Sequence, residues 1–157
     1  MTIKTLEDLF IHDLSDIYSA EKQITRALPK MARAATDEKL IAAFEQHLEE
    51  TRGQIERIDQ LVESTEGVRI KRMKCHALEG LAEEAQEIID SVEAGPVRDA
   101  GLIGAAQKVE HYEIATYGTL HALATKLGYK EAARLLAETL QEEKATDEKL
   151  TIIAEQK

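Results

Sequence analysis

An all-α fold is predicted by the amino-acid composition, by the spacing of the apolar residues and by the scarcity of helix breakers. Ala, Leu, Glu and Lys dominate the chain, and these residues favour helices. The 157 residues include only two prolines and eight glycines. Hydrophobic residues make up 43% of the chain and charged residues 32%, an ordinary balance for a globular domain. We therefore expect a single domain over residues 1–157 with a substantial helical core.

Apolar residues at helical spacing predict two long helices in the first half of the chain. Thr5 can cap the first helix, in which Pro29 lies close to the far end. Because proline disturbs a helix interior, we expect either a kink at Pro29 or an early end followed by a short helical extension. Thr36 or Asp37 is a suitable N-cap for the second helix, whose apolar pattern ends near Ser64.

The second half predicts one shorter helix and two further long ones. A connection over residues 64–75, broken by Gly67, leads to the short helix over residues 76–93. A long helix starts near Val97, and a tight turn around Gly128 leads to the last helix. Two antiparallel hairpins joined by a crossover that holds the short helix fit a ferritin-like four-helix bundle. The alternative is another kind of antiparallel helical protein.

Charge and cysteine content restrict the class of function. The net charge of −10 argues against nucleic-acid binding, because a phosphate track needs clustered Lys and Arg. The densest basic run, residues 69–74, is expected to be a solvated linker. Cys75 is the single cysteine, so it forms no internal disulfide, and we expect it to be a bystander. The sequence shows neither a signal-peptide pattern nor a membrane-spanning run, so a cytoplasmic location is expected.

A repeat relates the two hairpins. Laid over one another with an offset of 92 residues, the hairpins superimpose Glu21 on Glu113 and Glu50 on Glu142, and several core leucines also coincide. Within each hairpin, the two glutamates are equidistant from the turn. Because positions equidistant from the turn of an antiparallel hairpin lie at one height, all four carboxylates could converge at one level of the bundle.

Four carboxylates in a core repel one another and need compensation. A pair of metal ions supplies it, and oxygen ligands suit iron or manganese. Glu110 lies one turn before Glu113 on the same helix face, so this helix could provide a bridging and a terminal ligand. The alternative is that both residues lie on a solvated edge, or pair with Lys108 or Lys144.

The remaining ligands stay open at this stage. The usual second ligand follows the pattern Glu-x-x-His, but neither Glu50 nor Glu142 is followed by a histidine three residues later. His47 is a candidate ligand at the same height. On the last helix, Glu143 and Asp147 fall in the apolar stripe, so the stripe favours Glu143 whereas the repeat favours Glu142. Tyr18, three residues before Glu21, and Tyr112 could lie near the metals or be ordinary core phenols.

Four stretches resemble a known family: DLSDIYSAEKQITRALPKM, HLEETRGQIERI, GPVRDAGLIGAAQKVEHYEIATYGTL and LLAETLQEEKATDEKLTIIAE. They are similar to the YciE/YciF-like bacterial stress-response proteins, which are ferritin-like, and the resemblance covers nearly the whole chain. It implies a homodimer with a helical core similar to that of rubrerythrin, and a dinuclear site holding two iron ions per chain. The positions that would carry the site are Glu21, Glu50, Glu110, Glu113, and Glu142 or Glu143.

Two hypotheses about function follow. The first is a metal-binding protein of oxidant defence, in which two ferrous ions on the glutamate cluster react with O2 or peroxide in an oxidase- or peroxidase-type reaction. The second is a non-catalytic helical dimer of the stress response, with a structural or vestigial metal site. The single cysteine excludes an attached rubredoxin-like iron centre, which needs four cysteines.

Overall fold

The structure, a computed structural model, describes residues 2–156, and this range holds five α-helices and no β-strand. The all-α prediction is therefore confirmed. The helices are α1 (Leu6–Ala34), α2 (Glu38–Ser64), α3 (His76–Ser91), α4 (Pro96–Leu127) and α5 (Lys130–Glu155). Within residues 2–156, no helix is long and apolar enough to cross a membrane.

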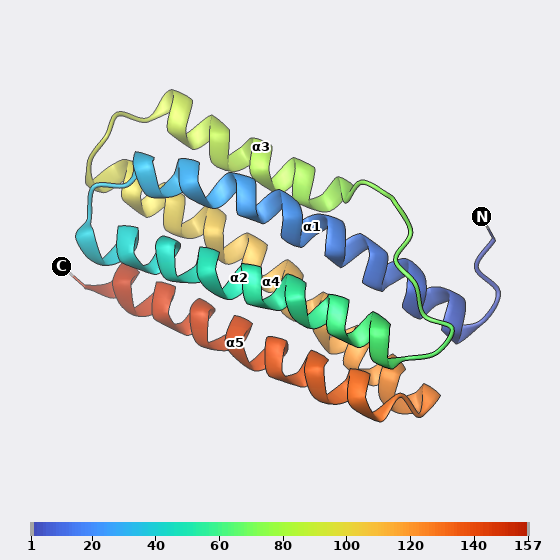
Figure 1. Cartoon of the computed structure of the whole chain (residues 1–157). Helices are drawn as coiled ribbons and strands as arrows, with labels where there is room; N and C mark the ends of the chain where they lie inside the picture. The colour runs from blue at the N-terminus through green and yellow to red at the C-terminus, as the bar shows by residue number, and fades with distance from the viewer. Residues whose placement is uncertain (1, 157) are drawn as a thin grey trace.

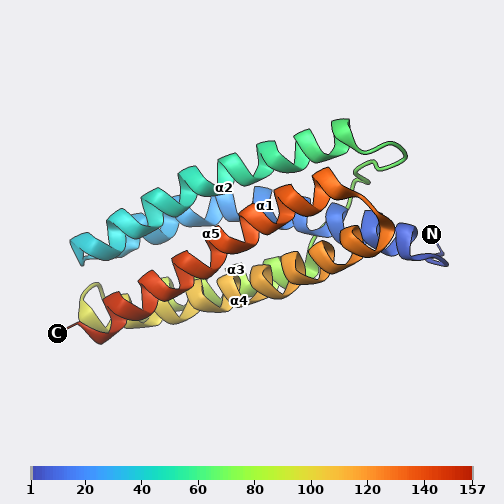
Figure 2. The same ribbon diagram turned by 90° about the horizontal axis from the view of Figure 1, so that it is seen from below.

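Four long helices surround one core, and the shorter α3 lies outside them (Figure 1). Helices α1 and α2 form one antiparallel hairpin, and α4 and α5 form the other. The hairpins meet through contacts of α1 with α4 and of α2 with α5, while α3 covers α1 and α4. Figure 1 also shows α2 and α5 on the opposite side of the molecule from α3, and in Figure 2, the view from below, α3 is largely hidden behind α4. The connection from α2 to α4 runs along the length of the molecule and contains α3, as the sequence predicts.

The predicted boundaries of the first hairpin hold. Thr5 caps α1 in a reciprocal capping box with Asp8. The helix continues through Pro29 to Ala34, so the expectation of an early end at the proline is wrong. Asp37 caps α2 by accepting hydrogen bonds from the backbone N–H groups of residues 39 and 40.

The buried Asp99 of α4 fastens the turn between α1 and α2. It accepts hydrogen bonds from the backbone N–H of Thr36 at 2.8 Å, from the Thr36 hydroxyl at 2.7 Å and from the backbone N–H of Asp37 at 3.0 Å. These charge-assisted bonds join the start of the second hairpin to the turn of the first. They therefore help to set the relative height of the two hairpins, on which the central site depends.

The second half of the chain also follows the prediction closely. Gly67 interrupts the connection with a φ of 84°, and Gly128 ends α4 in the left-handed conformation with a φ of 79°. Helix α3 ends at Ser91 rather than at residue 93. Cys75, expected to be an unremarkable linker residue, is instead fully buried and caps α3 through its sulfur atom.

Candidate metal centre

Five buried ionisable residues interrupt the apolar core near the middle of the long helices. Each long helix contributes at least one of them: Glu21 from α1, His47 from α2, Glu110 and Glu113 from α4, and Glu143 from α5. In four of these, His47, Glu110, Glu113 and Glu143, one potential ligand atom per residue lies within 4.8 Å of the others. The structure therefore brings together donors that are far apart in the sequence.

Helical periodicity explains why these side chains point inward. Glu21 lies between Ile17 and Ile24 on the buried stripe of α1. Glu110, Glu113 and Tyr117 follow one another at intervals of three and four residues along the buried side of α4. The Tyr117 hydroxyl donates a hydrogen bond of 3.1 Å to Oε2 of Glu21, which links α4 to α1 inside the cluster.

Most polar atoms of the cluster have no hydrogen-bond partner among the described residues. These are both carboxylate oxygens of Glu113 and of Glu143, one oxygen each of Glu21 and Glu110, and both ring nitrogens of His47. Nε2 of His47 lies 2.6 Å from Oε1 of Glu110, but the two groups are not aligned as a hydrogen bond. Ionised carboxylates can only accept hydrogen bonds, so the neighbouring carboxyl groups of Glu21 and Glu113 can pair only by sharing a proton, and the same holds for Glu110 and Glu143. A cation between the carboxylates is the alternative to a shared proton.

Burial and mutual repulsion favour the protonated forms of the carboxyl groups. Burial, with a contribution from the Glu143 charge, raises the pKa of Glu21 to about 7. Burial, with the charges of Glu21 and Asp147, raises the pKa of Glu110 to about 8. The pKa values of Glu113 and Glu143 are raised well above 4.5, first by burial and then by neighbouring carboxylates. A cation in the cluster would relieve both effects.

Three predicted site residues lie outside this group. Glu142 faces Arg57 of α2 in a two-pronged ion pair, with Nη1–Oε1 at 2.8 Å and Nη2–Oε2 at 2.6 Å, and it also accepts from Gln54. Burial raises the pKa of Glu142, but these hydrogen bonds outweigh it and leave the pKa lowered. Glu50 is half-buried. Asp147 is also half-buried, and its Oδ1 lies 3.4 Å from Nε2 of His111.

The register of the buried face of α5 explains why Glu143 and not Glu142 joins the cluster. Buried positions of α2 and α5 do correspond at the predicted offset of 92 residues, so Thr51 corresponds to Glu143 and Gln54 to Thr146. Glu50 and Glu142 correspond too, but each lies one residue before these inward positions. The places where Glu-x-x-His would project inward therefore hold Thr51-x-x-Gln54 and Glu143-x-x-Thr146, which leaves the site richer in ligands on the α4–α5 side.

Tyrosines near the cluster differ from those singled out in the sequence. Tyr18, for which proximity to the metals and an ordinary structural role were the two alternatives, donates a hydrogen bond to Asp59 at 2.9 Å rather than to a cluster residue. Tyr112 donates to Asp16 at 3.0 Å, with the Cys75 sulfur 3.2 Å from its hydroxyl. Tyr117 is the tyrosine that contacts a cluster carboxylate. In the sequence, the spacing of four residues between Glu113 and Tyr117 indicates that both side chains lie on the same face of α4.

The comparisons with known proteins agree with this geometry in fold and length. The model of a family described as a domain of unknown function, DUF892, matches residues 5–157. The chain belongs to the DUF892 family. A curated DUF892 relative, protein YciF of Escherichia coli strain K12, is 69% identical over 154 residues, which cover 98% of this chain and 93% of the relative. The family predicted from the four sequence stretches is thereby confirmed.

Solved structures extend the comparison from sequence to shape. The crystal structure of the E. coli stress protein YciF matches with a TM-score of 0.95 at 69% identity, covering 97% of this chain and 96% of that one. YcfI of Rhodopseudomonas palustris, described as a proposed structural protein, matches with a TM-score of 0.90 at 48% identity, covering 95% of this chain and 94% of that one. This DUF892 chain is therefore homologous to a stress protein along nearly its full length.

Proposed function

We propose that this chain is a ferritin-like bundle whose central cluster binds two metal ions, iron in the first place, and that it serves in the oxidative or general stress response. The observation that carries the proposal is the convergence of four buried glutamates and one histidine with most of their polar atoms unpartnered. Such a set of oxygen and nitrogen donors is typical of iron and manganese sites. The same donor set suits these metals better than zinc, which favours sulfur and nitrogen in structural sites.

The residues present fit a pair of ions. Glu21, Glu110, Glu113 and Glu143 would hold them, with His47 as the nitrogen ligand, and manganese is the alternative metal. When bound, ferrous iron would supply the electrons for reduction of O2 or peroxide. The chain's own residues would provide charge compensation, a water-poor setting and the Tyr117 hydroxyl that orients Glu21.

Anaerobic titration with ferrous iron tests the proposal. The double variant Glu21→Gln, Glu113→Gln removes two donors while leaving the side-chain volumes nearly unchanged. We expect the wild-type protein to take up about two ions per chain and the variant to lose that uptake. Glu45→Gln, Glu148→Gln is the matched control, because both residues are exposed glutamates on the long helices. Circular dichroism of each protein checks that helix content is retained.

Two results of this titration would contradict the proposal. Unchanged ferrous stoichiometry in the folded cluster variant would show that the ions bind elsewhere. Absence of uptake by the wild-type protein would remove the proposed function altogether.

A second candidate is a non-catalytic helical protein of the stress response, with a structural or vestigial metal site. Two observations favour it: the structural role proposed for YcfI, and the Thr51, Gln54 and Thr146 side chains at inward positions where further ligands would be expected. Under this candidate, the protein would keep its stability after treatment with chelator and would not consume peroxide. A homodimer and a cytoplasmic location accompany both candidates, and light scattering of the purified protein tests the dimer.

A further inference from the structure

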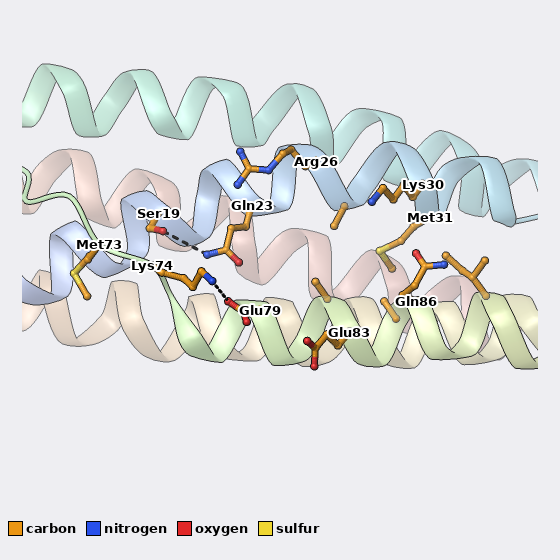
Figure 3. Close-up of a pocket in the computed structure, with 14 residues that line it drawn as sticks. Ser19, Gln23, Arg26, Lys30, Met31, Met73, Lys74, Glu79, Glu83 and Gln86 are labelled. Carbon is orange, nitrogen blue, oxygen red and sulfur yellow. Dashed lines mark hydrogen bonds and ion pairs between the residues drawn. The ribbon is translucent and has the colours of Figure 1, made fainter.

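A solvent-filled groove lies between α1 and α3, on the outer side of the hairpin pair. It has a volume of about 530 Å³. Figure 3 shows its labelled side chains, with Arg26 and Lys30 on α1 and the Lys74–Glu79 ion pair near the start of α3. The rim is charged, while the floor includes Met31 and small alanine side chains. In the figure, Met31 extends from α1 toward α3.

A small apolar chamber lies beneath this groove, between α1, α3 and α4. Its volume is about 20 Å³. All lining residues are apolar except His47 and Glu110, which belong to the candidate metal centre. The chamber therefore has hydrocarbon walls and one polar end at the cluster.

The groove and the chamber share a partition. Ala27, Met31, Ala82 and Ala85 line both. Three of these four side chains are single methyl groups, and methionine is the most adaptable apolar side chain. Among residues 2–156, only these four side chains line both the groove and the chamber, and Met31 is the flexible one among them.

We propose that the chamber is a binding site for one small apolar molecule, dioxygen in particular, on an access route that leads from the α1–α3 groove to His47 and Glu110. The volume suits it, because a cavity needs about 10–15 Å³ to hold a single water-sized molecule. The walls offer no hydrogen bonds, so water is disfavoured there and a diatomic gas is not. The access route to the cluster rests on the proposed function. The binding of a small apolar molecule in the chamber does not depend on that function.

The same walls discriminate against other reactants. A hydrated metal ion would lose its water shell without replacement ligands until it reached the cluster. Hydrogen peroxide carries two donors and several acceptor lone pairs, which hydrocarbon walls leave unsatisfied. The chamber therefore favours dioxygen over peroxide, and metal ions reach the cluster by another path.

Xenon is a suitable probe, because it is apolar and visible by X-ray diffraction. We expect crystals of the metal-free wild-type protein under xenon pressure to show xenon in the chamber beside Glu110. Ala106→Val adds two methyl groups to the chamber wall and should abolish that xenon site. Ala105→Val is the matched control, because Ala105 is a buried neighbour on α4 that lines neither the groove nor the chamber. It should leave the xenon site intact.

Kinetics then test the access role in protein loaded with ferrous iron. Ala106→Val should slow oxidation by dioxygen about tenfold or more, a rate change of the size that one modest added barrier produces, while the rate with hydrogen peroxide stays unchanged. If the wild-type chamber shows no density in crystals pressurised with xenon and none in crystals pressurised with dioxygen, the binding site is overturned, whatever the metal content. Xenon present with unaltered dioxygen kinetics would overturn the access route. Xenon present without any ferrous uptake would leave the chamber standing and overturn the proposed function alone.

Discussion

His47 and Glu110 approach to 2.6 Å between Nε2 and Oε1, although they come from α2 and α4, which lie diagonally across the core. Nε2 of His47 also lies 3.9 Å from Oε1 of Glu113. His47 is also the nitrogen donor of the set. Both ring nitrogens are buried and lack a hydrogen-bond partner among the described residues, so the ring is available to a ligand.

Replacing His47 should therefore weaken metal uptake. We expect His47→Gln to lower the affinity for ferrous iron by at least about tenfold, because it removes a neutral nitrogen donor from the site. Anaerobic titration gives the affinity. His111→Gln is the control, since His111 is a largely exposed histidine that forms an ion pair with Asp147 at the edge of the bundle. Equal affinities for the two variants would exclude His47 as a ligand.

Glu142 and Glu143 are adjacent in sequence and should behave in opposite ways. Glu142→Gln removes the charge that faces Arg57, so we expect the free energy of unfolding to fall by about 1–2 kcal/mol while ferrous affinity is unaffected. Glu143→Gln should lower ferrous affinity and raise the stability of the metal-free protein at pH 8, because burial disfavours the ionised form of Glu143, the form that the unfolded chain holds at this pH. Chemical denaturation gives the free energy of unfolding of each variant, and anaerobic ferrous titration gives its affinity for ferrous iron. Loss of metal binding in Glu142→Gln, with binding retained in Glu143→Gln, would contradict the assignment.

The raised carboxyl pKa values predict an unusual pH dependence of stability. A carboxyl whose pKa is higher in the folded than in the unfolded protein holds its proton more tightly when folded. Its stabilising contribution is complete below about pH 4.5 and is lost as the pH rises through the folded pKa, which is about 7 for Glu21 and about 8 for Glu110. For Glu21 alone, the loss amounts to roughly 3 kcal/mol.

The metal-free protein should thus become less stable between pH 5 and pH 8, opposite to the usual acid behaviour of salt-bridged carboxylates. Thermal unfolding at a series of pH values measures this trend. Bound metal should flatten it, because the ions need the deprotonated carboxylates and compensate their charge. The Glu21→Gln, Glu113→Gln variant should show a weaker trend without metal. A wild-type melting temperature that rises steadily from pH 5 to pH 8 would contradict the protonated cluster.

Some parts of this architecture can be read from sequence and others cannot. Caps and breakers act locally, so Thr5, Asp37 and Gly128 mark helix ends in the sequence and in the structure alike. The repeat likewise identifies Glu21 and Glu113, because both lie on strongly apolar stripes. Periodicity does not separate Glu142 from Glu143 when two patterns disagree, since adjacent residues are only about 100° apart around a helix.

The placement of several other side chains depends on contacts with residues of other helices, which the sequence does not reveal. Arg57, a residue 85 positions earlier in the chain, holds Glu142 outside the cluster. The residues around Glu142 in the sequence do not predict this pairing. Tyr18 turns to Asp59 rather than to Glu21, again because of a neighbouring helix. Cys75 is buried because the connection before α3 folds back onto α1. There the hydroxyl of Ser19 accepts a hydrogen bond from the backbone N–H of Cys75.

Metal analysis of the wild-type protein, purified without chelator, tests the central claim most directly. Elemental analysis is followed by anaerobic ferrous titration and by an optical spectrum after exposure to air. We predict about two iron ions per chain and the appearance of a ferric absorption band. Protein that contains no metal and takes up no ferrous iron would contradict the account, and the buried carboxylates would then belong to a structural protein.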